Sequence, residues 1–424
     1  MPFWRSASPI SPGSRVCLSF LSILMWHTYR AGHPQGMPHM SKLICHTKKH
    51  TTLMKIIDIQ WHTYRLPFLH KFHTAHGFMD TREGVIVQVT TNEGVTGIGE
   101  IAPLPTFNGG SLADACSLLP ELNGHLYYSK LYEALELLAG EKVSTKSAST
   151  LCGLEIALLD ALGKTTDCSV STLLSPAHFT PREAVPVNAV ISAKATKAAA
   201  EIALNAKKNG FPCVKLKVGL GLSISEEVER IATVRDTIGP TIHLRLDANE
   251  AWQLEEAIAI LSQCVPYNIQ YIEQPLKAQN LVGMRTLRQE IPIPIAVDEA
   301  VHDLESVYLV LDNEVADILV IKPQLAGGLR IAQQMIRAAS ESGVYCVITS
   351  TIEAGIGLAA ELHLVAASPQ VTLECGLATL PLLADDLLAE ELLVRDGFLA
   401  VPTGPGLGVG LDQQALDRYS SGLQ

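Results

Sequence analysis

The sequence predicts an α/β protein, a (β/α)8 barrel of the TIM type preceded by an N-terminal α+β capping domain. With 424 residues, 47% of them hydrophobic and 18% charged, the chain can bury a large core and is long for one domain. After about Pro186, short apolar segments alternate with polar, alanine-rich helical segments at a period of about 25 residues. Eight such apolar segments follow one another, which is the strand count of a closed barrel. An open, doubly wound sheet is the structural alternative.

Residues 1–53 are predicted to lie outside the fold. Residues 1–57 contain seven Lys and Arg and no acidic residue, and the apolar run at 16–26 is too short to span a bilayer. A transit peptide, a failed signal peptide and a leader upstream of a start at Met54 are the three readings. We favour the last, because MKIIDIQWHTYRLPF begins a strand without needing anything before it.

The capping domain is expected over 54–180. Strand-like segments at 54–66 and 84–102 precede helical patterns at 111–139 and 147–164, and TNEG within the second segment reads as a hairpin turn. The stretches 67–83 and 106–111 are predicted to be loops that close over the barrel mouth.

The barrel is expected over 181–390, and 391–424 is expected to return to the capping domain. The predicted strands are 185–192, 213–219, 242–249, 269–275, 293–299, 317–323, 345–351 and 371–377.

Composition narrows the compartment and the partners. The net charge of -11 becomes -18 without the basic residues 1–57, which argues against nucleic acid as a partner. Nine scattered cysteines without a CxxC pair favour a reduced, cytoplasmic compartment, although the N-terminal extension leaves organelle targeting open. A soluble enzyme with a small-molecule substrate and no membrane partner is expected, and the sequence leaves a homo-oligomer open.

Three carboxylates end consecutive predicted strands. Asp247, Glu273 and Asp298 are 26 and 25 residues apart, so one β/α unit separates each from the next. In a barrel they converge at the C-terminal rim, where such barrels hold their active sites. Three oxygen ligands on adjacent strands suit a hard divalent cation, Mg²⁺ with Mn²⁺ as the alternative.

Three lysines accompany these carboxylates. Lys215 and Lys217 alternate within the second strand and therefore share its inward face, and Lys322 ends the sixth strand. A buried ammonium group without a partner costs roughly several kcal/mol. Each of these lysines is therefore expected to have a carboxylate partner or a catalytic role. Burial and neighbouring positive charge are expected to lower the pKa of one lysine towards use as a general base. A base opposite a metal suits removal of a proton α to a carboxylate.

The motifs KLK (215–217), LDAN (246–249), IEQP (272–275), VDE (297–299) and IKPQLAGG (321–328) resemble the enolase superfamily in its muconate-lactonising branch. The resemblance covers roughly 54–424 and implies a Mg²⁺ site made by the three carboxylates. It implies Lys217 as the base, Lys322 as the opposing lysine, Lys215 as a modulator of Lys217, and Asn249 as a support for the metal site.

Within that branch, several stretches resemble the o-succinylbenzoate synthase family, among them TREGVIVQV (81–89), GEIAPLPTF (99–107), TSTIEAGIG (349–357) and VPTGPGLGVGLD (401–412). This resemblance implies a lyase that dehydrates 2-succinyl-6-hydroxy-2,4-cyclohexadiene-1-carboxylate to 2-succinylbenzoate in menaquinone or phylloquinone biosynthesis. Ser350, Glu353 and Gly376 are the expected substrate contacts on the last two strands.

Isomerases on the same scaffold are the main alternatives. Dipeptide epimerases of this branch carry Asp-x-Asp on the eighth strand to hold the substrate ammonium, whereas this chain has ECGLA at 374–378. That difference disfavours dipeptides and leaves N-succinylamino acid racemisation open. A non-catalytic metal-binding protein is a further alternative, which the presence of all five metal and lysine positions disfavours.

Overall fold

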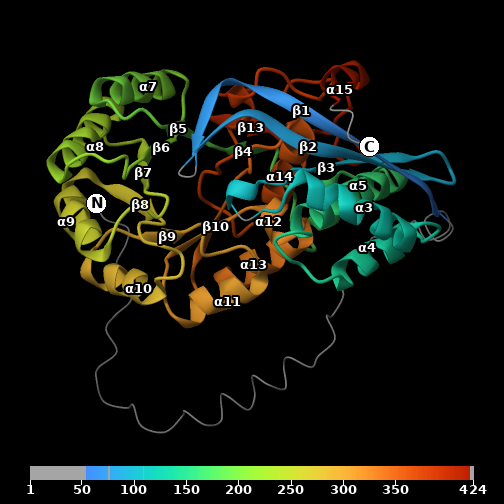
Figure 1. Cartoon of the computed structure of the whole chain (residues 1–424), viewed down its shortest axis with the longest axis horizontal. Helices are drawn as coiled ribbons and strands as arrows, with labels where there is room; N and C mark the ends of the chain where they lie inside the picture. Colours follow the sequence, from blue (N-terminus) through green and yellow to red (C-terminus); the bar gives the residue numbers. More distant parts are fainter. Residues whose placement is uncertain (1–53, 75–76, 108, 421–424) are drawn as a thin grey trace, which may run out of the picture. The chain divides into compact units, whose positions relative to one another are not determined.

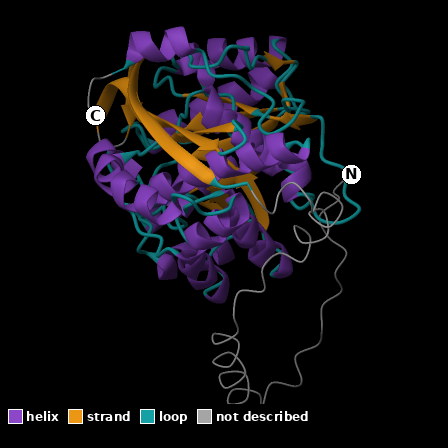
Figure 2. Cartoon of the chain, turned by 90° about the vertical axis from the view of Figure 1, so that its right-hand side faces the viewer, coloured by secondary structure: helices purple, strands orange, loops and turns teal. Residues whose placement is uncertain are grey.

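Parallel strands form the centre of the molecule. The computed structural model describes residues 54–74, 77–107 and 109–420, and the predicted extension 1–53 lies outside them (Figure 1). Seven parallel strands pair in the order β11-β10-β9-β8-β7-β6-β5, and helices surround them (Figure 2). The predicted fold class, a TIM-type barrel behind an N-terminal capping domain, is confirmed.

Strands and helices alternate along the barrel. The strands are β5 (Asn188–Ile191), β6 (Cys213–Lys217), β7 (His243–Asp247), β8 (Ile269–Glu273), β9 (Ile295–Val297), β10 (Ile318–Ile321) and β11 (Tyr345–Ile348). The helices are α7 (Thr196–Lys208), α8 (Ile224–Ile238), α9 (Leu254–Cys264), α10 (Leu281–Glu290), α11 (Leu304–Asp312), α12 (Pro323–Ala326), α13 (Leu329–Glu341) and α14 (Gly355–Ala366), with η2 (Val265–Tyr267) before β8.

Polar side chains fix the first residue of several helices. Ser223 begins α8 and Asp303 begins α11, each with a reciprocal side-chain to backbone pair three residues apart. These pairs satisfy N–H groups that the first helical turn leaves free. The sequence therefore determines locally where the loops that follow β6 and β9 end.

The predicted eighth strand, 371–377, is only partly formed. It makes single bridges to both edges of the seven-stranded sheet, which closes the ring. The backbone bonds are Cys375 N to Pro186 O (2.8 Å), Asn188 N to Cys375 O (3.0 Å), Gly376 N to Ile348 O (2.9 Å) and Ser350 N to Gly376 O (3.2 Å). Because Cys375 bonds to one edge and Gly376 to the other, no ladder of consecutive pairs develops.

The capping domain is a three-stranded antiparallel sheet with helices. Its strands are β1 (Ile56–Thr74), β2 (Gly77–Thr91) and β3 (Thr96–Ile101), paired in that order. After η1 (Pro105–Phe107) come α3 (Leu112–Leu126), α4 (Leu131–Gly140), α5 (Ala148–Thr166) and α6 (Val170–Leu174). The TNEG turn is confirmed between β2 and β3, where Gly94 has a φ of 79°.

The predicted loop over 67–83 is wrong, because β1 and β2 continue through most of it. Pro67 pairs with Thr81, and the register shifts between Pro67 and Phe72. β1 is the edge strand of its sheet, and proline is tolerated at an edge because its missing N–H leaves no inner ladder bond unmade. The result is a long hairpin, coloured blue in Figure 1.

The C-terminal residues return towards both parts of the fold. After η3 (Leu380–Leu382), β12 (Val394–Arg395) and β13 (Phe398–Ala400) form a small sheet with β4 (Ala184–Pro186). Ser420, just after α15 (Gln413–Tyr419), bridges to Tyr64 of β1. The division at 180 and 390 stays a prediction.

Among the residues that the structure describes, none of the helices is long and apolar enough to cross a bilayer.

The capping sheet lies unusually close to α5. A Cβ built on Gly99 of β3 would be 2.1 Å from the carbonyl oxygen of Gly153 and 2.7 Å from the amide nitrogen of Ala157, both in α5. Only a residue without a side chain permits this approach of strand backbone to helix backbone.

We expect Gly99→Ala to lower the free energy of unfolding by about 1–3 kcal/mol, because the added methyl group must push α5 away from β3. Gly124→Ala is the matched control. It lies in α3 with open space around its Cβ, and it should raise stability by about 0.5–1 kcal/mol. Urea unfolding of both variants checks this, and equal effects of the two changes would contradict it.

Candidate active site

The charged residues predicted from the sequence lie at the C-terminal ends of adjacent strands. Asp247 and Glu273 are the last residues of β7 and β8 and are paired with one another across the sheet. Asp298 follows β9 directly, and Lys322 follows β10 as the residue that precedes α12. All four are at most 8% exposed.

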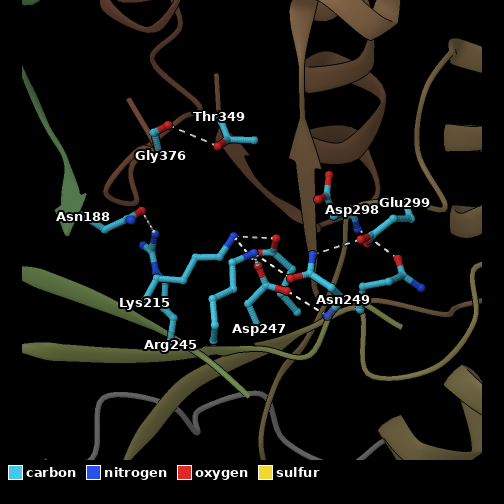
Figure 3. A network of polar contacts seen from close by, with 12 residues as sticks. Asn188, Lys215, Arg245, Asp247, Asn249, Asp298, Glu299, Thr349 and Gly376 are labelled. Carbon is cyan, nitrogen blue, oxygen red and sulfur yellow. Dashed lines mark hydrogen bonds and ion pairs between the residues drawn. The ribbon is translucent and has the colours of Figure 1, made fainter. Parts of the chain in front are cut away.

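The lysines of β6 both contact Asp247. Lys215 Nζ lies 2.8 Å and Lys217 Nζ 2.6 Å from Asp247 Oδ2. Lys215 Nζ also donates to Glu273 Oε1 at 2.6 Å, and Figure 3 shows Lys215 beside Asp247. The predicted common inward face of the two lysines is confirmed, since alternate residues of one strand reach a single oxygen atom.

Lys322 has a separate partner. Its Nζ donates to both oxygens of Asp298 at 2.6 Å. The ring of Phe107, from η1 of the capping domain, lies over the same ammonium group at 4.7 Å. The predicted segment 106–111 therefore reaches the site through Phe107, in a contact of cation–π type.

The expected lowering of a lysine pKa is not seen at Lys215 or Lys322. Burial lowers the pKa of Lys215, but the Asp247 and Glu273 carboxylates outweigh it, and the net pKa is well above the usual value. Burial likewise opposes the effect of Asp298 and Glu299 at Lys322, where the net pKa is also raised. The expectation was wrong for these two because their carboxylate neighbours lie within hydrogen-bond distance.

The carboxylates respond in opposite directions. Burial raises the pKa of Asp247, but the positive charges of Lys215 and Lys217 lower it by a larger amount. The net pKa therefore lies well below the usual range. Burial and the Asp247 charge raise the pKa of Glu273 to about 7, against the lowering effect of Lys215. Asp247 has two ammonium partners and Glu273 shares one, which explains the difference.

The donor set has the chemistry of a site for a hard divalent cation. Three carboxylates from three adjacent strands supply oxygen ligands only, and Glu273 Oε2 is a buried atom without a hydrogen-bond partner. In the described part of the chain, however, no group of three or more His, Cys, Asp and Glu side chains is arranged to hold a metal, and a lysine contacts each of the three carboxylates. The oxygen donors fit Mg²⁺, and the assignment of a metal to them stays a proposal.

Asn249 connects the site to a residue that the sequence reading missed. Its Oδ1 accepts from Lys217 Nζ at 2.6 Å, and its Nδ2 donates to Glu299 Oε1 at 3.0 Å, as Figure 3 shows for Asn249 and Glu299. Burial raises the pKa of Glu299 to about 8, with Asp298 and Asp247 adding to the effect. The sequence feature that could have identified Glu299 is its place as the second acid of the VDE motif, directly after the predicted ligand Asp298.

Gln274 was also missed. It is fully buried, and its Oε1 accepts from the backbone N–H of Asp298 at 3.0 Å and of Ala300 at 3.3 Å. The residue after one predicted ligand therefore fixes the backbone of the next. The IEQP motif contained this residue, but the spacing of carboxylates gave no reason to select an amide.

The three predicted substrate contacts are placed differently from one another. Ser350 and Gly376 are neighbours at the rim, where Ser350 N donates to Gly376 O at 3.2 Å and Thr379 Oγ1 donates to Ser350 Oγ at 3.1 Å. Glu353 is completely buried, and its carboxylate accepts hydrogen bonds from Ser350 and Thr351. These contacts favour a supporting role for Glu353 over the direct contact with substrate expected from the sequence.

Comparisons with known proteins give the same architecture. The family described as Enolase C-terminal domain-like matches residues 197–415, and the family Mandelate racemase / muconate lactonizing enzyme, N-terminal domain, matches residues 58–175. The solved structure of muconate lactonizing enzyme from Pseudomonas fluorescens, complexed with muconolactone, superposes with a TM-score of 0.79 at 25% identity. It covers 87% of this chain and 100% of that chain.

Two curated relatives differ in activity. The L-Ala-D/L-Glu epimerase of Bacillus subtilis (strain 168) is 30% identical over 366 residues, 84% of this chain and 97% of the epimerase. The o-succinylbenzoate synthase of Thermobifida fusca (strain YX) is 37% identical over 221 residues, 52% of this chain and 67% of the synthase. The chain therefore belongs to the mandelate racemase/muconate lactonizing enzyme family of the enolase superfamily.

Proposed function

We propose that this protein is a Mg²⁺-dependent o-succinylbenzoate synthase of menaquinone or phylloquinone biosynthesis. It would convert 2-succinyl-6-hydroxy-2,4-cyclohexadiene-1-carboxylate to 2-succinylbenzoate and water. The synthase of Thermobifida fusca supports the proposal, although it matches over a shorter part of the chain than the epimerase of Bacillus subtilis. The choice between synthase and dipeptide epimerase depends on the residues at the place of the eighth barrel strand, 371–377.

Glu374 and Gly376 occupy that position. Glu374 Oε2 accepts from Arg245 Nη2, and its Oε1 lies against His243 Nδ1, both at 2.7 Å. His243 begins β7, at the end of the barrel opposite the rim, so Glu374 is engaged away from the mouth. Gly376, two residues on, has no side chain. Neither residue offers the anion that a dipeptide's ammonium group requires, and this observation carries the proposal.

The lysines suit an elimination. Lys217 is the most exposed of the three, with 28% of its side chain accessible against 13% for Lys215 and 9% for Lys322. As a neutral amine, Lys217 would take the proton α to the substrate carboxylate and then return a proton to the departing hydroxyl, which leaves as water. The C–H and C–O bonds break and the ring becomes aromatic.

Lys322 has the complementary role. Burial lowers the pKa of Lys322, but the Asp298 and Glu299 carboxylates raise it by more, which favours the cationic form. A fixed positive charge there stabilises the enediolate that forms when the α proton leaves. When bound at Asp247, Glu273 and Asp298, a divalent cation would supply further stabilisation of negative charge on the substrate carboxylate.

Racemisation of N-succinylamino acids is the second candidate. The same lack of an anion at Gly376 fits this class, because an acylated nitrogen carries no positive charge. Two lysines from β6 and the end of β10, four strands apart in the sheet order, also suit proton transfer on two faces of a substrate.

We expect the purified chain with Mg²⁺ to consume the cyclohexadiene substrate rapidly, with loss of its diene absorbance, and a chelator to abolish turnover. The ultraviolet assay with and without chelator measures this. Folded, Mg²⁺-loaded protein that shows no turnover, but exchanges deuterium at the α carbon of N-succinylamino acids, would replace the synthase by the racemase.

Lys217→Ala should lose at least about 10²-fold in kcat, the usual scale for removal of a general base. Lys277→Ala is the matched control, since Lys277 has a 59% exposed side chain and pairs with Glu250 at 3.4 Å, and its kcat should not change. Full turnover by Lys217→Ala would show that another group is the base.

Glu374→Gln should cost about 3–5 kcal/mol of stability, because it leaves the fully buried Arg245 guanidinium without a carboxylate partner. His243→Gln, which alters the half-exposed partner, should cost less than about 1 kcal/mol. Urea unfolding measures both. A folded and equally stable Glu374→Gln variant that has lost turnover would instead place Glu374 against the substrate.

A further inference from the structure

Three buried glutamates lie behind the barrel rim and take no part in the proposed reaction. Glu100 comes from β3 of the capping domain, Glu353 from the loop between β11 and α14, and Glu361 from α14 itself. Their exposed fractions are 0%, 0% and 1%. Three acids in one interior region must have their charge balanced by protons or by hydrogen-bond donors.

Glu100 has a complete set of donors. It accepts from Tyr64 Oη at 2.6 Å and from the backbone N–H groups of Ala354 and Gly357, both at 2.8 Å. Those two N–H groups belong to the start of α14, where backbone donors have no helical partner. The capping domain therefore supplies the carboxylate that caps a barrel helix.

Glu353 has three hydrogen-bond donors. It accepts from the hydroxyl groups of Ser350 and Thr351 and from the N–H of Thr351 at 3.0 Å. These donors come from the rim residues immediately before it. Glu353 therefore determines the conformation of the segment 350–353 and the direction of the Ser350 hydroxyl.

Glu361 differs from both. Neither of its carboxyl oxygens has a hydrogen-bond partner in the part of the chain that the structure describes. Its exposed fraction is 1%, so bulk solvent does not reach the carboxyl group. An ionised carboxylate is the least favourable state for such a group.

Gly357 leaves the space through which Glu353 approaches Glu361. Gly357 and Glu361 are four residues apart in α14 and therefore lie on one face of the helix, and Glu353 comes just before the helix begins. A Cβ built on Gly357 would be 2.7 Å from both Cβ and Cγ of Glu353, and 3.2 Å from Glu100 Oε2. The side chain of Glu353 therefore occupies the space that a side chain at position 357 would need.

The groups that face Glu361 are acidic. Burial raises its pKa well above the usual value, and Glu353, Glu100 and Cys375 raise it further. From α5, Cys152 is close enough to feel the charges of Glu155 and all three glutamates of this region. Tyr64, on β1, donates to Glu100 and also has a raised pKa, mainly because it is buried.

We propose that Glu361 is a neutral carboxylic acid that donates a hydrogen bond to Glu353 and so holds the Ser350–Thr351 rim in position. Glu361 is then a positioning residue that acts through Glu353 and contacts no substrate. The effect on substrate binding rests on the proposed function. The location of the proton does not, and the two are tested separately.

The proton is tested by comparing wild type with Glu361→Gln, which keeps a neutral donor of the same shape. A carboxyl group with a raised folded-state pKa binds more protons in the folded than in the unfolded protein, so it lowers stability as pH rises above the usual 4.5. Urea unfolding from about pH 5 to pH 8 should show wild type losing stability relative to the variant. The loss should be about tenfold in the equilibrium constant per pH unit until the folded-state pKa is reached. Other acids are present in both proteins, so parallel curves would overturn the proposal.

The positioning role is tested by the dehydratase assay on Glu361→Leu, Glu361→Gln and Ser350→Ala. Glu361→Leu, which has no donor, should raise KM about tenfold with a smaller change in kcat, and Glu361→Gln should restore the wild-type value. Adding Ser350→Ala to Glu361→Leu should cause no further rise, because both changes disable one unit. Equal defects in the Leu and Gln variants, or additive effects with Ser350→Ala, would overturn this role. If no variant turns over the cyclohexadiene, the proposed function fails, and the unfolding comparison still decides where the proton lies.

Discussion

Mutual neutralisation of buried lysines and carboxylates is the constraint on which the mouth of the barrel depends. Each of the three ammonium groups lies within hydrogen-bond distance of at least one of the carboxylates of Asp247, Glu273 and Asp298, in a region that excludes most solvent. A single charge of this set would be strongly destabilising without its partners, because no other interaction would compensate for the free energy lost when the charge leaves water. The ring of parallel strands brings these opposite charges together, because β6 to β10 place their C-terminal ends at one rim.

The contacts between the capping domain and the barrel are also mostly buried and polar. Arg82 of β2 is 2% exposed, and its guanidinium donates to the carbonyl oxygen of Ile352 in the barrel and to those of Glu83, Pro103 and Ala102 within the capping domain itself. Glu155 of α5 accepts from the N–H of Leu329 and from the side chain of Arg330. These bonds fix the capping domain at the same loops that surround the proposed site.

Much of this site was predictable from the sequence, because strand ends are set by local patterns. A carboxylate at the end of each apolar segment, repeated at one β/α unit, was enough to gather Asp247, Glu273 and Asp298 at one rim. The length of the β1–β2 hairpin was not predictable, since pairing at a sheet edge outweighed the turn signals around Pro67. The incomplete eighth strand was missed for a related reason, because its apolar pattern does not reveal that Cys375 and Gly376 bond to opposite neighbours.

Residues that act through others were the hardest to predict. Nothing in the sequence distinguishes Glu353, which supports Ser350 from behind, from a carboxylate exposed at the mouth. Gln274 and Glu299 raise the same difficulty, because their importance comes from contacts with residues far apart in the chain.

The short helix α12 gives the two parts of the fold a direct mechanical connection. Lys322 precedes its first residue, and Gln324, two residues later, bonds through both atoms of its amide to the backbone of Glu100 and Ala102 near the end of β3. A displacement of the capping sheet is therefore transmitted through a single helical turn to the Lys322 ammonium. Substitutions on the capping domain far from the mouth can in this way alter the alignment of a charge that they never contact.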